Sequence, residues 1–231
     1  MKAKPTRSDR RMVRNRKALL GAAEKLIAEK GIERLTIDEI TEAADLAKGT
    51  FYNYFKDKNE IAGELALAIR REIRAQVGIA EQGIDDPAAQ VIAGIAVCLH
   101  AAAVSPTRAA ILSRMYSLWL SPEANKEFRL FKDLEAGYRT GRFSAGDLPV
   151  AVVLTVGVVQ AGITRALVLA EWNAIRKLAL ALCEAVLRAL GIKGSEAHAV
   201  SARVIARVFA NDSRVTPGHA TMVGLNRQTN S

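Results

Sequence analysis

The segment at residues 35–61 (LTIDEITEAADLAKGTFYNYFKDKNEI) constrains the fold most, because it combines two short helix signals with a tight connector. Thr36 and Glu39 form a Ser/Thr-x-x-Glu capping box, which predicts that a helix begins there. Asp45 suits a sharp turn after this helix, since Asp tolerates left-handed backbone geometry better than most residues. A second helix is predicted over residues 48–55. This layout is typical of helix-turn-helix DNA readers.

The faces of the second predicted helix differ in chemistry. At about 100° per residue, Phe51 and Phe55 share one face, which suits packing against the first helix. The residues on the other faces suit contact with the major groove of DNA. Asn and Thr can hydrogen-bond to base edges, Gly permits close approach, and Tyr hydroxyls are common partners of phosphates. Alternatively, the two tyrosines are half-buried links to the next helix. The residues expected outside the Phe face are Gly49, Thr50, Tyr52, Asn53 and Tyr54.

Residues 46–55 (LAKGTFYNYF) and the following KDKNEI resemble the signature of the tetracycline-repressor-like (TetR) transcriptional regulators. The resemblance is specific over about residues 16–65, and beyond them only the helical layout and total length agree. The family usually has Gly where this chain has Asp45. The resemblance implies an all-α fold, with an N-terminal three-helix helix-turn-helix head and a larger C-terminal helical domain for ligand binding and dimerisation.

The resemblance also implies residue roles on DNA, and the helical angles make these roles plausible. Positions matching the family's major-groove contacts are Lys48, Gly49, Thr50, Tyr52 and Asn53. Positions matching its phosphate contacts are Thr36, Tyr54 and Lys58.

The net charge of +9 favours polyanionic partners, although it does not separate DNA from RNA or anionic lipid. Much of it lies before residue 20, where eight Lys and Arg face only Asp9. We expect a basic flexible arm at 1–12, with a merely solvated tail as the alternative for residues 1–9. The head is expected at 13–56, the effector-binding and dimerisation domain at 57–210, and a disordered tail at 211–231.

Hydrophobic periodicity and capping signals predict helices throughout the chain. The valine-rich run at 148–170 favours a strand by propensity, but its length and its Asp147–Pro149 start favour a helix. A membrane span is a further alternative, although Gln160, Thr164 and Arg165 interrupt it; a buried helix packed from several sides fits best. Besides those of the head, helices are expected at 14–30, from 57 onward, and at 87–104, 106–120, 122–141, 148–170, 172–190 and 195–210.

The helices at 148–170 and 172–190 are too apolar to leave one face in water. A pair from each of two subunits would form a four-helix bundle, in which Gly157 and Ala161 allow close approach. The resemblance points the same way, because family members dimerise through their last two long helices. Burial of the whole surface within one chain is the alternative.

A ligand pocket is implied by the resemblance, because family regulators typically bind a small molecule in the C-terminal domain and lose DNA affinity. Polar or amphipathic residues amid apolar helices are its candidate lining. These are His100, Arg114, Tyr116, Trp119, Gln160 and Arg165.

The sequence therefore predicts a sequence-specific DNA-binding regulator, a homodimeric repressor released from a palindromic double-stranded operator by a small-molecule effector. No cofactor, metal site or catalytic apparatus is expected, because His100, His198 and His219 are scattered and Cys98 and Cys183 lack ligand spacing. The N-terminus lacks the apolar core of a signal peptide, which favours the cytoplasm without membrane partners. The alternatives are an enzyme or a helical scaffold on anionic lipid.

Overall fold

The computed structural model describes residues 6–114 and 129–210, which contain helices and no strand. The all-α prediction is confirmed for these residues. The end of the helix predicted at 106–120, the start of that at 122–141 and the predicted tail at 211–231 lie outside them. The helices are α1 Arg7–Lys30, α2 Ile37–Ala43, α3 Lys48–Tyr52, α4 Lys58–Ala80, α5 Pro87–Val104, α6 Pro106–Arg114, α8 Arg129–Arg139, α9 Leu148–Leu169, α10 Trp172–Ala189 and α11 Gly194–Phe209.

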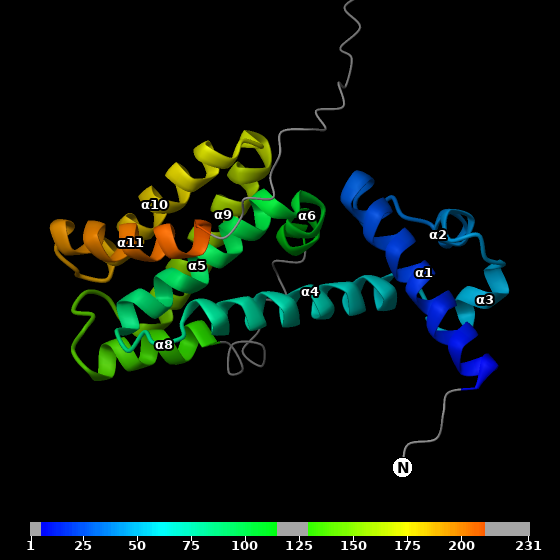
Figure 1. The fold of residues 1–231 in the computed structure, drawn as a ribbon, viewed down its shortest axis with the longest axis horizontal. Coiled ribbons are helices and arrows are strands. Elements are labelled where there is room, and N and C mark those ends of the chain that lie inside the picture. The colour runs from blue at the N-terminus through cyan, green and yellow to red at the C-terminus, as the bar shows by residue number, and fades with distance from the viewer. Residues whose placement is uncertain (1–5, 115–128, 211–231) are drawn as a thin grey trace, which may run out of the picture.

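The molecule has a small head and a larger helical body joined by one long helix (Figure 1). Helices α1, α2 and α3 form the head, and α4 runs from it into the body. In the body, α5 contacts α4, α6, α8, α9, α10 and α11, so it is the central helix. α6 also packs against α1, which gives the body a second contact with the head.

The head is held together by one apolar core beneath the second and third helices. Leu19, Ile40 and Phe51 are each fully buried, and Phe55 is 2% exposed. The Phe51 and Phe55 ring centroids lie 5.6 Å apart, so the shared face predicted from their spacing is confirmed. α3 ends at Tyr52, three residues before the predicted end, although the Phe55 amide still donates to the Phe51 carbonyl at 3.0 Å.

The first helix starts earlier than its apolar periodicity predicts. Thr6 caps α1 through a reciprocal capping box with Asp9, so the helix begins at Arg7 instead of residue 14. Residues 7–12 of the predicted flexible arm are therefore helical. The capping signal was missed because the apolar stripe starts only further along the helix, and this turn is exposed.

Residues 148–170 form a helix, as predicted, and not a strand. Asp147 caps α9 by accepting from the Val150 amide at 2.9 Å. α9 packs against α5, α6, α8 and α10, so packing from several sides is confirmed. It is not a fully buried helix, however, because Val150, Val153 and Val168 are between 59% and 70% exposed. α5 and α9 both have the length and hydropathy of a membrane span. The central position of α5 accounts for its composition, whereas α9 has an exposed apolar face.

Candidate DNA-contacting surface and ligand cavity

The third helix presents its polar residues to solvent while its aromatic anchor is buried. Lys48, Gly49 and Asn53 are exposed, Tyr52 is 54% exposed, and Thr50 is half-buried. Phe51 beneath them fixes the orientation of this short helix. Tyr54 is half-buried and packs against the apolar core, which agrees with the alternative given above for the tyrosines. The exposed set is therefore available to a duplex.

The turn before α3 has the geometry that Asp45 predicts. Asp45 lies in the left-handed region with φ 53°, where Gly is favoured and Asp is tolerated. The Leu46 amide donates to the Thr41 carbonyl at 2.9 Å, which closes the connection. Thr41 itself is 5% exposed and donates its hydroxyl back to the Ile37 and Asp38 carbonyls. The Leu46 bond therefore ties the connector before α3 to α2, and the Thr41 hydroxyl is satisfied within α2.

Lys48 at the start of α3 is paired within the head. Its Nζ lies 2.7 Å from Oδ1 of Asp38 on α2, and both side chains are more than half exposed. The hydrogen bond to Asp38, followed by its charge, raises the pKa of Lys48. Exposed ion pairs contribute little to stability, so a phosphate or base edge can replace Asp38 at small cost.

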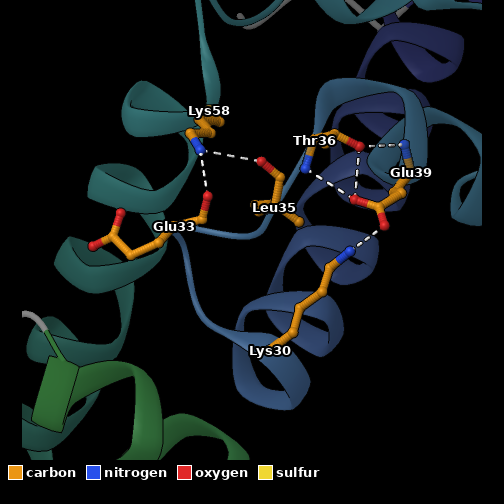
Figure 2. A network of polar contacts seen from close by, with 6 residues as sticks. All are labelled: Lys30, Glu33, Leu35, Thr36, Glu39 and Lys58. Carbon is orange, nitrogen blue, oxygen red and sulfur yellow. Dashed lines mark hydrogen bonds and ion pairs between the residues drawn. The ribbon is translucent and has the colours of Figure 1, made fainter.

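A polar network joins the C-terminal end of α1 to the N-terminal end of α2 (Figure 2). Thr36 donates its amide to Glu39 Oε2 at 3.0 Å and accepts from the Glu39 amide at 3.3 Å, which confirms the predicted capping box. Lys30 on α1 pairs with the same carboxylate. Hydrogen bonds from Lys30 and then Thr36 lower the pKa of Glu39 to about 2, so α2 stays capped at physiological pH.

Lys58 has a structural contact that the sequence did not predict. Its Nζ donates to the backbone carbonyls of Glu33 at 3.0 Å and Leu35 at 3.2 Å, tying α4 to the loop before α2 (Figure 2). An ammonium group has three hydrogens, so one remains for another acceptor. Lys58 therefore orders the head, and phosphate contact would be an additional role.

A cavity of about 540 Å³ lies in the body between α4, α5, α8 and α9. Its wall is mostly apolar, and its size is within the range of small-molecule sites. Apolar lining residues include Val77, Ile95, Cys98, Leu112, Phe131 and Val156.

The predicted pocket residues agree with this cavity only in part. Gln160 lines it and donates to the Ser113 carbonyl at 2.8 Å. His100 lies elsewhere, because its ring stacks edge-on against Trp172 and Phe209 with centroids 5.4 and 5.3 Å away. Arg165 is exposed on α9 and does not line the cavity. The side chains of Arg114, Tyr116 and Trp119 lie outside the described part of the chain.

Sequence reasoning missed an acidic pair at one end of the cavity. Glu81 and Asp133 both line it, and they are only 3% and 8% exposed. Arg129 pairs with Glu81 Oε2. A sequence signal existed, because the buried register of α4 at Ile73 and Val77 continues four residues on to Glu81. An acid at a core position is a candidate functional residue.

Contacts through α6 connect the cavity with the head. Leu112 lines the cavity near the end of α6. One turn before it, Arg108 donates Nε to Glu24 of α1 at 2.7 Å and also pairs with Glu72 of α4. α6 therefore contacts the cavity, helix α1 of the head, and helix α4, which joins the head to the body.

Two family models match the chain. The one described as "Bacterial regulatory proteins, tetR family" matches residues 19–65, and "Tetracyclin repressor-like, C-terminal domain" matches residues 86–203. The second match covers just over half of the chain. The chain belongs to the TetR family of bacterial transcriptional regulators, which are DNA-binding and generally non-enzymatic proteins.

Curated relatives match over a short segment. The chain is 42% identical over 48 residues to the uncharacterized HTH-type transcriptional regulator YvdT of Bacillus subtilis (strain 168), which is 21% of this chain and 25% of YvdT. It is 32% identical over 59 residues to YhgD of the same organism, covering 26% and 31% of the two chains. The chain thus matches a third or less of the length of these relatives.

Solved structures match over most of the chain. RolR without ligand has a TM-score of 0.56 and 27% identity, covering 81% of this chain and 96% of RolR. RolR in complex with resorcinol has a TM-score of 0.51 and 28% identity, covering 84% and 96%. A putative tetR family regulator from Shewanella sp. PV-4 has a TM-score of 0.64 at 17% identity, covering 78% and 99%, and supports the fold alone.

Proposed function

We propose that this protein is a cytoplasmic homodimeric repressor that reads a palindromic operator through α3 and leaves it when a small molecule occupies the cavity. The observation that carries DNA reading is the exposed polar surface of α3, fixed from below by buried Phe51. We assign base contacts to Lys48, Gly49, Thr50, Tyr52 and Asn53, and phosphate contacts to Thr36, Tyr54 and Lys58. We place the boundary between the DNA-binding head and the effector-binding domain between residues 56 and 57.

Asn53→Ala tests base reading. The operator is first obtained by selecting random duplexes on the purified protein. We expect Asn53→Ala to weaken binding to the selected duplex about 10-fold, because a lost base contact costs about 1–3 kcal/mol, with little change on random DNA. The measurement is fluorescence anisotropy at several salt concentrations.

Lys58→Ala is the matched comparison. It is expected to weaken selected and random duplexes alike and to reduce the salt slope by about one, as a lost phosphate contact does. Melting curves of both variants show whether the head is still folded. Equal losses on random DNA for Asn53→Ala and Lys58→Ala would remove the assignment of base reading to Asn53.

The exposed face of α9 supports the homodimer. Val150, Val153, Gly157, Ala161 and Val168 recur at three, four or seven residues, so they form one stripe along the helix. A Cβ at Gly157 would meet no described atom within 4 Å, so packing within the chain does not require glycine there. Glycine in a helix interior costs about 1 kcal/mol relative to Ala. Close approach of a second copy accounts for it.

The mostly apolar cavity supports release by an effector, as does the resorcinol complex of RolR. A ligand shifts the equilibrium only by its differential affinity for the two states, typically about 1–3 kcal/mol. α4 and α6 line the cavity and contact the head, so ligand-induced displacement of either helix changes the separation of the two α3 helices.

Arg108→Met tests the contact between head and body. Glu24 is 23% exposed, and losing its partner leaves a poorly solvated carboxylate at the α1–α6 contact. We expect α1 amides near Glu24 to exchange with deuterium about tenfold faster, equivalent to ~1.4 kcal/mol. Arg188→Met breaks a 4.0 Å pair on α10 and is the control. Unchanged α1 exchange in Arg108→Met would show that this bridge does not couple head and body.

A further inference from the structure

We propose that the cavity selects an apolar ligand carrying a hydrogen-bond-donating hydroxyl or amine, which it holds against Asp133 with Glu81 behind it. This inference rests on the proposed role of the cavity as the effector site. Both carboxyl groups line the cavity: Glu81 directly follows α4 as its C-cap residue, and Asp133 lies on α8.

The two carboxyl groups are buried, and Glu81 is poorly satisfied. The Glu81 side chain is 1% exposed, and its Oε1 accepts no hydrogen bond from any residue in 6–114 or 129–210. Its other oxygen pairs with Arg129, whose side chain is 48% exposed. Asp133 is 8% exposed and retains access to the cavity. Buried polar atoms without partners are costly, so a donor brought by a ligand is favoured here.

The charges of the pair favour the same ligand class. Burial, followed by the charge of Asp133, raises the pKa of Glu81 to about 7, and Arg129 opposes part of this effect. Burial raises the pKa of Asp133 to about 6. A hydroxyl or ammonium group placed against Asp133 stabilises its ionised form and reduces the repulsion from Glu81. A ligand carboxylate at this position would add a third negative group.

The cations around the cavity are placed less favourably for a ligand. Arg71 and Arg74 line the cavity from exposed positions and Arg70 from a half-buried one, whereas Glu81 and Asp133 are buried. Arg129 already pairs with Glu81. Contacts with exposed charges contribute less than contacts with buried ones, so the buried acids determine selectivity.

A matched ligand series tests this selectivity on the full chain. The compounds are para-butylphenol, para-butylbenzylamine, para-butylbenzoate and para-butyltoluene, which share an apolar body suited to the cavity wall. Binding is measured by calorimetry at neutral pH. We expect the phenol or the amine, or both, to bind about tenfold more tightly than the benzoate and the toluene. Preference for the amine alone would identify a cationic effector, and preference for the phenol alone a neutral one.

Substitutions of Asp133 and Glu81 test whether these two carboxyl groups cause the ligand preference. Asp133→Asn is expected to reduce amine affinity about tenfold and to raise benzoate affinity, and Glu81→Gln should act in the same direction. Glu135→Gln on the exposed face of α8 removes one carboxylate away from the cavity lining and is the control. Thermal melts followed by circular dichroism show whether each variant is folded. The ranking of the four compounds on the wild-type protein tests the proposal even if a variant does not fold.

The outcomes separate this inference from the proposed function. Tighter binding of the benzoate, equal binding of all four compounds or binding of none would overturn the donor preference. A donor compound that binds with the expected preference but leaves operator affinity unchanged supports this site and counts against effector-controlled release. Release of DNA by the benzoate alone would support the proposed ligand-controlled regulator and exclude the ligand class assigned to the cavity.

Discussion

Val153→Glu is expected to convert the protein from a dimer to a monomer and to lower its affinity for the selected operator by about 100-fold or more. Val153 is 61% exposed and lies near the N-terminal end of the α9 stripe. In a two-fold interface the new carboxylates would be desolvated near one another, which is strongly unfavourable. A monomer binds one half-site at a time and loses the avidity of linked heads, typically about 10²–10⁴-fold.

Ile79→Glu provides the comparison, because Ile79 is 63% exposed but lies on α4, outside α9 and α10. Sedimentation velocity measures the oligomeric state, and anisotropy measures operator binding. We expect Ile79→Glu to remain dimeric with wild-type affinity. A wild-type protein that sediments as a monomer, or a Val153→Glu variant that stays dimeric, would exclude this interface.

The head was predictable because local signals and tertiary packing agree there. Thr36 and Glu39 specify where α2 begins, and Asp45 occupies a left-handed turn that its side chain tolerates. Phe51 and Phe55 share a face by spacing alone and are both buried. Lys58 shows the limit of this reasoning, since its carbonyl partners lie more than twenty residues earlier in the sequence.

The cavity was not predictable by the same route, because it forms where separate helices fail to fill space. His100 resembles a ligand contact in sequence, but packing places it against rings from α10 and α11. The acidic pair combines the residue that follows α4 with one on α8, and Glu81 and Asp133 are more than fifty residues apart in the sequence. Only the continuation of the buried α4 register to Glu81 was visible in the sequence.

The double variant Glu81→Gln/Asp133→Asn is expected to gain stability relative to wild type as pH rises from 5 to 8. The folded-state pKa values, about 7 for Glu81 and about 6 for Asp133, exceed their ordinary values of 4.5 and 3.8. The folded wild type therefore binds more protons than the unfolded chain between those limits, so its stability falls as pH rises through this window. Neutral amides do not titrate, and the variant escapes this loss.

The expected difference between pH 5 and pH 8 is about 2–4 kcal/mol, since one pKa unit corresponds to ~1.4 kcal/mol and water in the cavity screens part of the effect. Urea unfolding at both pH values measures it, with Glu135→Gln as the exposed control. A pH dependence identical to wild type would mean that the pair is not desolvated in the folded protein. A gain confined to high pH would instead show that the chain retains two buried acids at a cost to its own stability, which is expected of groups kept for binding.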